Sequence, residues 1–417
     1  MVTRELRAIA LLLALSAAAP AQDLGPTRSA PDPSGSIVLE SLDGTLRRRA
    51  ENAPPLTSLA EAGAAFARFE GVAMAPGEES SSEVDPKDRA SLELAGGDRL
   101  SAAVRGGDGD LLTVALRGGV ELQLSIDGIR SVVFPARIPA SVTSSPTAGE
   151  EGDRLYLVAV NGLDRAEGFV DSFEADGVRF EDARLGSRTY AWDRVAALFV
   201  SPLEDEREQE DEDRGERVSV ALVGGGRISG ELVEIGSPVE GVRLRLGEAA
   251  DVQLPGSIVT EVALDDGSFR FLGDLEPTDR GTSSPFDDDL GFVWPMRVDR
   301  SCRGGLLQVA GVTYARGLGV HAPSELTWSL DGEWKELRFL CGVDDTGVSG
   351  ARGGAVIFRV RSGDRVLWES DVVRAGSPAL APMPVPVQGV TSLVLEVDPA
   401  GDFVLDRADW LRPMLVR

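Results

Sequence analysis

The chain has 417 residues, of which 42% are hydrophobic, so it can form two to four folded domains and is not intrinsically disordered. Its formal net charge is −26, from 68 acidic and 42 basic residues. Nucleic-acid binding needs clustered Lys and Arg, so we expect no nucleic-acid partner. The single His and the lack of HExxH, CxxC and GxSxG patterns exclude multi-His zinc sites and argue against a nucleophile elbow.

The N-terminus has the pattern of an export signal. Two Arg residues precede the apolar run Ala8–Ala19, and an A-x-A cleavage pattern closes it. We predict a signal peptide over residues 1–21 and a secreted or periplasmic mature protein. The apolar run is too short to span a membrane and no later run is long enough, so we expect no membrane span. Residues 22–87 are rich in Pro, Ser and acidic residues and are interpreted as a linker or low-order region.

Three similar segments follow, at residues 88–135, 151–203 and 216–275. Each opens with alternating apolar and polar residues, turns at Gly, and closes on further alternating residues. This pattern predicts four to five antiparallel strands per segment, enough for a small barrel. The Arg-Ile-Ser-Gly of residues 227–230 resembles the opening of an Sm-like fold. We predict small SH3-like or Sm-like β-barrel units that serve as spacers or protein contacts.

Two stretches separate these units from their neighbours. Residues 204–216 are almost all charged and mostly acidic, and we interpret them as a solvated loop. Residues 276–288 are rich in Pro, Ser, Thr and Asp, as an interdomain linker would be.

The last segment, residues 289–417, shows strand alternation and no helical period. Its alternating stretches lie at residues 326–330, 337–341, 356–360, 366–368 and 393–397. A segment of this length and pattern predicts one antiparallel β-sandwich. The fold class that we predict for the whole chain is therefore all-β.

Four ordered motifs make this segment recognisable. They are RGLGVHAPSEL at 316–326, CGVDD at 341–345, VIFRVRSGDRVLWES at 356–370 and LDRADW at 405–410. Together they resemble the NPCBM family, carbohydrate-binding modules first noted beside glycoside hydrolases, over about residues 292–416. The resemblance implies a galactose-binding-like β-sandwich (jelly roll) and a glycan ligand, with galactose-type sugars as candidates. It also implies a structural calcium ion in some relatives.

The motifs supply the candidate ligand-binding residues, which are Arg316, His321, Asp344, Asp345, Asp406, Asp409 and Trp410. Asp344 and Asp345 can accept sugar hydroxyls, ligate a hard cation such as Ca²⁺, or cap turns, and the pattern leaves these alternatives open. For His321 we favour a buried strand residue with one hydrogen bond. Trp410 can stack on a sugar, although a Trp in a small sandwich more often belongs to the core. The sequence identifies no exposed aromatic platform.

The two cysteines, Cys302 and Cys341, can form a disulfide or be buried small apolar residues, and both alternatives stay open. As a whole, the sequence predicts a secreted, non-catalytic carbohydrate-binding protein with no certain cofactor. One alternative is a structural or adhesion protein that contacts protein partners through residues 88–275. The other is a glycoside-hydrolase-associated protein with cryptic activity.

Overall fold

The computed structural model describes residues 35–50, 52–72, 85–142, 145–149, 152–201, 215–246, 251–279 and 294–417. The regular elements in these ranges are β-strands and short 3₁₀ turns, which confirms the predicted all-β fold. The predicted signal peptide, residues 1–21, lies outside the described residues, as does most of the acidic run at 204–216. Within the described ranges, no helix is long and apolar enough to cross a membrane.

Each of the three repeats is a unit of five antiparallel strands with one pairing order. Four strands follow one another as hairpins, and the fifth returns to pair with the first. Repeat 1 contains β4 (Arg89–Leu94), β5 (Arg99–Asp108), β6 (Leu111–Ala115), β7 (Glu121–Ser125) and β8 (Ile129–Val133). Repeat 2 contains β9 (Asp153–Ala159), β10 (Gly162–Phe173), β11 (Gly177–Asp182), β12 (Gly186–Ala191) and β13 (Val195–Phe199). Repeat 3 contains β14 (Arg217–Leu222), β15 (Arg227–Ile235), β16 (Val242–Arg245), β17 (Asp251–Leu254) and β18 (Val259–Leu264).

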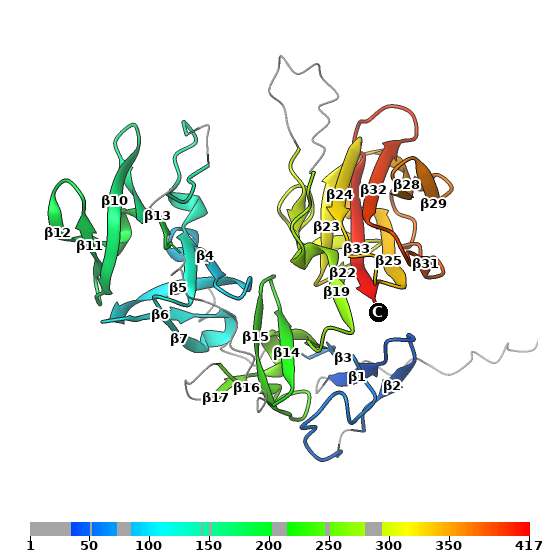
Figure 1. Cartoon of the computed structure of the whole chain (residues 1–417), viewed down its shortest axis with the longest axis horizontal. Helices are drawn as coiled ribbons and strands as arrows, with labels where there is room; N and C mark the ends of the chain where they lie inside the picture. Colours follow the sequence, from blue (N-terminus) through cyan, green and yellow to red (C-terminus); the bar gives the residue numbers. More distant parts are fainter. Residues whose placement is uncertain are drawn as a thin grey trace, which may run out of the picture. The chain divides into compact units, whose positions relative to one another are not determined.

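Figure 1 shows the three repeats in colours from cyan to green. The 3₁₀ turns beside these and later strands are η2 (Pro86–Asp88), η3 (Arg117–Gly119), η4 (Pro135–Arg137), η5 (Trp192–Arg194), η6 (Gly256–Ile258), η7 (Leu272–Asp274) and η9 (Asp345–Gly347). The SH3-like or Sm-like character of the units stays a prediction.

The second strand of every repeat is the longest strand and carries a β-bulge. The register shifts lie between Val104 and Gly106 in β5, Val170 and Ser172 in β10, and Leu232 and Glu234 in β15. A bulge bends and twists its strand, so one long strand can pair with a different neighbour along each half. The structure thus contains three bent units with the same strand order.

The residues before repeat 1 differ from the expected low-order linker. They contain β1 (Ser36–Glu40), β2 (Leu46–Arg48) and β3 (Phe66–Glu70), and β1 pairs with both of the others. β3 also pairs with β18 of repeat 3, and Ile37 and Phe66 are buried. The prediction missed these strands because short apolar stretches are hidden in a segment that is polar on average.

The C-terminal segment is a sandwich of two antiparallel sheets. The first sheet contains, in order, β20 (Arg297–Val298), β23 (Gly317–His321), β33 (Arg407–Val416), β25 (Glu336–Val343) and β31 (Val385–Pro386), with β19 (Phe269–Phe271) also paired to β33. The second sheet contains β24 (Ser324–Ser329), β32 (Ser392–Pro399), β28 (Ala355–Ser362) and β29 (Arg365–Glu369), with β30 (Val373–Arg374) paired to β28. Two hairpins add β21 (Leu307–Val309) with β22 (Val312–Tyr314), and β26 (Val348–Ser349) with β27 (Arg352–Gly353). Figure 1 shows β24 and β32 side by side.

The core of the sandwich lies between its two sheets and contains the apolar residues that alternate along the strands. Phe358 and Trp410 are fully buried and pack edge to face, with ring centroids 5.0 Å apart. Cys341 belongs to the same core, whereas Cys302 is half-buried in the segment after β20. Both thiols are free, so the structure shows the buried-apolar alternative for Cys341 and no disulfide between the two.

Candidate functional site

Three strands of the first sheet end at one edge of the sandwich. His321 is the last residue of β23, and it pairs with Arg407, the first residue of β33. Asp344 directly follows β25, and its backbone N–H donates to the Arg407 carbonyl at 2.9 Å. Antiparallel pairing therefore brings side chains from three separate motifs to the same edge.

Two aromatic side chains lie at this edge as well. The Trp294 ring stacks on the His321 ring with a centroid separation of 3.8 Å and an interplanar angle of 14°, and Phe403 lies 6.5 Å from Trp294. Trp294 and Phe403 are half-buried, so part of each ring faces solvent. We call Trp294, His321, Phe403, Asp406 and Arg407 the strand-end site. The sequence did not reveal the two aromatic residues because both lie outside strands, where no alternation marks them.

Burial sets the protonation state of His321. Its side chain is mostly buried, and this burial lowers its pKa below the usual value despite the hydrogen bond to Ala322. Nδ1 lies 2.8 Å from the Ala322 carbonyl oxygen, which can only accept a hydrogen bond. Nδ1 therefore carries the proton, and Nε2 is the acceptor of a neutral ring. His321 is a buried strand residue, as the sequence favoured, and its ring stacks on the Trp294 ring.

Asp406 lies directly before β33 and is 1% exposed. Its Oδ1 accepts a hydrogen bond from the Ala355 N–H at 2.8 Å, and its Oδ2 has no hydrogen-bond partner among the described residues. Burial raises the pKa of Asp406 to about 6, against the opposing effect of the Ala355 hydrogen bond. The neighbouring Arg407 donates to the Thr346 carbonyl and so ties β33 to the η9 loop.

Asp344 and Asp345 cap turns. Asp344 is the N-cap of η9, where its Oδ1 accepts from the Thr346 N–H at 2.9 Å. The two carboxylate oxygens of Asp345 accept from the N–H groups of Ala310 and Gly311, each at 2.8 Å. The structure therefore shows the turn-capping alternative, in which these carboxylates hold the β21–β22 turn against the η9 loop.

Asp409 is fully buried beside these two carboxylates. Burial raises its pKa to about 10, and the Asp344 carboxylate adds to the effect, so Asp409 is protonated at neutral pH. In the part of the chain that the structure describes, no group of three or more His, Cys, Asp or Glu could hold a metal ion. The calcium ion expected at Asp344 and Asp345 stays a prediction.

Two of the predicted ligand-binding residues face the interior. Arg316 is 3% exposed, donates to the Ser219 Oγ of β14 at 2.8 Å, and pairs with Asp274 at 3.3 Å. Trp410 is fully buried on the core-facing side of β33, so neither face of its ring is open to a sugar. Both side chains therefore point away from solvent in this structure, and a ligand-binding role for them stays a prediction.

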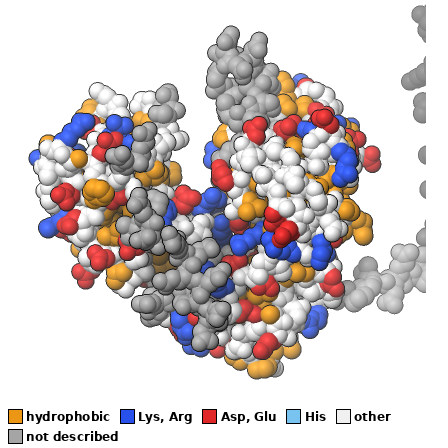
Figure 2. Space-filling view, in the orientation of Figure 1, with side chains coloured by type: hydrophobic (Ala, Val, Ile, Leu, Met, Phe, Trp, Pro, Cys, Tyr) orange, Lys and Arg blue, Asp and Glu red, His pale blue; other side chains and the backbone are white. Residues whose placement is uncertain are grey.

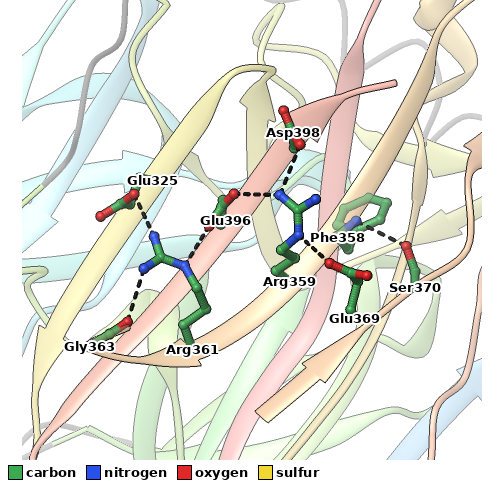
Figure 3. Close-up of polar contacts among 9 residues, drawn as sticks. All are labelled: Glu325, Phe358, Arg359, Arg361, Gly363, Glu369, Ser370, Glu396 and Asp398. Atoms are coloured by element: carbon green, nitrogen blue, oxygen red, sulfur yellow. Dashed lines mark hydrogen bonds and ion pairs between the residues drawn. The ribbon is translucent and has the colours of Figure 1, made fainter. Parts of the chain in front are cut away.

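The outer face of the second sheet is a ladder of ion pairs, drawn in Figure 3. Arg359 of β28 contacts Glu369, Glu396 and Asp398, the last two at 2.7 and 2.9 Å. Arg361 of the same strand contacts Glu325, Glu396 and the Gly363 carbonyl. These cross-strand contacts satisfy the guanidinium groups of Arg359 and Arg361.

The two antiparallel sheets and the core between them define the C-terminal segment as a β-sandwich domain. Residues 272–416 match the family model of the NPCBM/NEW2 domain. This match confirms the resemblance carried by the four motifs and begins earlier than they do, at Leu272 in η7.

One curated protein and two solved structures illustrate the similarity. Alpha-1,3-galactosidase B of Akkermansia muciniphila is 40% identical over 119 residues, which cover 28% of this chain and 14% of that enzyme. The chain thus matches only a small part of that relative's length. CBM51 from Clostridium perfringens GH95 in complex with methyl-galactose is 23% identical, over 36% of this chain and 99% of that one, with a TM-score of 0.31. The tandem CBM51 modules of Sp3GH98, the family 98 glycoside hydrolase from Streptococcus pneumoniae SP3-BS71, are 11% identical over 91% of this chain and 99% of that one, with a TM-score of 0.31.

Proposed function

We propose that this protein is a secreted, non-catalytic carbohydrate-binding protein whose strand-end site holds a neutral, galactose-type glycan. The observation that carries the proposal is the Trp294–His321 stack with Phe403 beside it, partly open to solvent in a domain that matches the NPCBM/NEW2 family. Export rests on the signal pattern of residues 1–21.

The chemistry of the strand-end site suits a sugar ring. A sugar has an apolar C–H face, and stacking that face on Trp294 or Phe403 removes apolar surface of both partners from water. The neutral His321 supplies an acceptor at Nε2 and Arg407 supplies guanidinium donors, so both kinds of hydroxyl hydrogen bond have a partner. Stacking gives most of the affinity in this arrangement, and the polar groups select the orientation.

Binding without hydrolysis is supported by the state of the carboxyl groups near the site. A glycosidase needs two carboxyl groups that flank the scissile bond. The strand-end site contains one carboxyl group, Asp406, which is buried and accepts from the Ala355 N–H. Nearby, Asp344 and Asp345 are engaged with turn N–H groups, and Asp409 is buried and protonated. Galactosides are the first ligands to test, because the curated relative of A. muciniphila is named for galactosidase activity.

Calorimetry on the full chain tests this proposal with a panel of methyl glycosides, methyl α-galactoside first. We expect binding of a galactoside, and we expect Trp294→Ala to weaken it at least about tenfold, as truncation of a buried aromatic anchor does. The matched control is Phe169→Ala, which removes an aromatic ring that is 62% exposed in repeat 2. The Phe169→Ala variant should bind the galactoside with the same affinity as the unsubstituted chain. Absence of binding to every sugar on a glycan array would refute the proposal, and release of nitrophenol from a nitrophenyl galactoside would refute its non-catalytic part.

A second role, protein contact through the repeats, is favoured by the open edge of repeat 2. β12 pairs only with β11 among the described strands, and most of its residues are exposed. An exposed strand edge can pair with a strand of another chain, and Phe169 and Leu185 add exposed apolar surface to the same repeat. A second copy of this chain is the first partner to test by sedimentation. Self-association that Phe169→Glu abolishes would support this role, and a monomer at all concentrations would oppose it.

A further inference from the structure

A cavity of about 590 Å³ is lined by repeat 1, repeat 3 and the start of the sandwich. Three arginines contribute to its wall: Arg89 from β4, Arg117 from η3 and Arg300 from the segment after β20. No Asp or Glu is among the described residues that line it. This is unusual in a chain with a formal net charge of −26. On the face drawn in Figure 2, Lys and Arg side chains lie among Asp and Glu side chains.

Two of these three guanidinium groups have no partner among the residues that the structure describes, which is also true of other exposed arginines such as Arg188 and Arg365. Arg300 donates to the Gly224 carbonyl at 2.5 Å. The guanidinium groups of Arg89 and Arg117 have no hydrogen bond or ion pair with any residue that the structure describes, unlike those of Arg359 and Arg361 on the sandwich. These two arginines thus keep all their donors for a ligand.

Two of the arginines converge on one glycine turn. A Cβ atom added to Gly225 would lie 2.5 Å from the Arg300 guanidinium carbon, and one added to Gly224 would lie 3.5 Å from Arg117 Nη1. Both glycines have positive φ, so the turn favours residues without side chains for conformational reasons too. The missing side chains leave room for the two guanidinium groups on either side of the turn.

Cations that lie near one another repel, and a bound oxyanion reduces this repulsion while it accepts hydrogen bonds from the free N–H groups. The planar guanidinium group is suited to carboxylate and sulfate because it can donate two parallel hydrogen bonds. A long polyanion would be repelled by the acidic chain as a whole, so a small anion that fits the cavity is favoured.

The rest of the lining indicates what carries the anion. Ser91 and Ser101 supply hydroxyl groups, and Leu116 and Ile258 supply apolar surface. A cavity of this volume is within the range of small-molecule sites. We propose that this cavity binds an acidic saccharide, with the carboxylate or sulfate group held by Arg89, Arg117 and Arg300 and the sugar ring against the serines and the apolar wall. This site is separate from the strand-end site, which we propose for neutral sugars.

Calorimetry on the full chain at low ionic strength tests this proposal, with digalacturonate as the probe and lactose as a neutral disaccharide of similar size. We expect digalacturonate to bind, and its affinity to fall as salt is added. Arg117→Ala should weaken digalacturonate binding at least about tenfold, because it removes a charge-assisted contact. Arg117 is exposed, so the substitution should leave the fold intact. Any binding of lactose at the strand-end site should be unchanged, which separates failure of this proposal from failure of the proposed function.

Arg188→Ala is the matched control, since it removes one exposed arginine from β12 of repeat 2, outside the lining of the cavity. It should leave digalacturonate affinity unchanged. Inorganic sulfate is the third probe, because it carries the charge without the sugar ring, and it should bind more weakly than digalacturonate. The proposal is overturned if digalacturonate does not bind, if Arg89→Ala/Arg117→Ala binds it as tightly as the unsubstituted chain, or if sulfate binds and digalacturonate does not.

Discussion

The repeats and the C-terminal sandwich form their cores in different ways. Each repeat has only five strands, and the repeats share strand pairings with their neighbours: β13 pairs with β8 as well as β9, and β18 pairs with β3 as well as β14. The sandwich instead has a separate cluster of buried residues between its two sheets, including Trp328, Phe358 and Trp410. A repeat therefore depends on adjacent units for part of its burial, whereas the sandwich has a closed core.

The arginines of the two regions also differ in their hydrogen-bond and ion-pair partners. On the sandwich, Arg359 and Arg361 are satisfied by carboxylates across the strands. In the cavity at the repeats, Arg89 and Arg117 have no such partner among the described residues. The difference shows that Arg359 and Arg361 are held by carboxylates of their own sheet, whereas two arginines of the cavity keep their N–H donors available.

The largest expected effect comes from Arg412→Met, which tests whether the two regions unfold together. Arg412 lies on β33 and pairs with Glu40 of β1 and with Glu261 of β18, which is 4% exposed. Removing the cation leaves Glu261 buried without a partner, so we expect the free energy of unfolding to fall by about 3–5 kcal/mol. Urea unfolding followed by circular dichroism measures it. The control Arg338→Met breaks a more exposed pair with Glu336 and should cost less than about 1 kcal/mol. Equal, small losses in both variants would mean that the contact does not couple the regions.

The sequence predicted the strands well where alternation was long and regular. The sandwich strands from Leu326 onward and the recurring unit of the repeats both follow from period-two patterns, because each strand buries one face. β1 and β3 escaped prediction because their short apolar stretches lie among polar residues, and their burial depends on pairing with β18, which is distant in the chain. Local pattern does not report such long-range pairing.

The candidate site was predicted less completely, for a physical reason. His321, Asp406 and the turn-capping carboxylates lie on or beside strands. They therefore fall within the recognisable motifs. Trp294 and Phe403 lie in loops, where nothing in the pattern separates an exposed ring from a buried one. Trp410 and Arg316 had the right residue types for a sugar site, but the sequence does not show which way a side chain points at the edge of a strand.

A second, smaller effect concerns the pH dependence of stability that Asp406 of the strand-end site contributes. The pKa of Asp406 is about 6 in the folded protein against the ordinary value of 3.8, so the folded state binds this proton more tightly than the unfolded state does. Its contribution to stability is complete below about pH 4 and is lost as the pH rises through about 6. One pKa unit corresponds to about 1.4 kcal/mol, so the loss is at most about 3 kcal/mol.

Asp406→Asn checks this by removing the titrating group while keeping an oxygen that can accept from the Ala355 N–H. Urea unfolding over a pH series should show that the variant loses less stability between about pH 4 and pH 6 than the unsubstituted chain. Asp364→Asn, an exposed carboxylate in the β28–β29 turn, is the control and should follow the unsubstituted chain. Parallel pH curves for Asp406→Asn and the unsubstituted chain would show that Asp406 is not the group responsible.

The smallest expected effect is that of Glu325→Gln on the ion-pair ladder of the sandwich. Glu325 contacts Arg361 at 2.6 Å, but its side chain is 53% exposed, and Arg361 keeps Glu396 and the Gly363 carbonyl as partners. Solvent screens such a pair, so we expect a loss of less than about 1 kcal/mol that shrinks further at high salt. Urea unfolding at low and high salt measures both. A salt-independent loss as large as that of Arg412→Met would contradict this expectation. It would mean that the exposed ion pairs of the sandwich stabilise the protein as strongly as the buried pairs of Arg412 do.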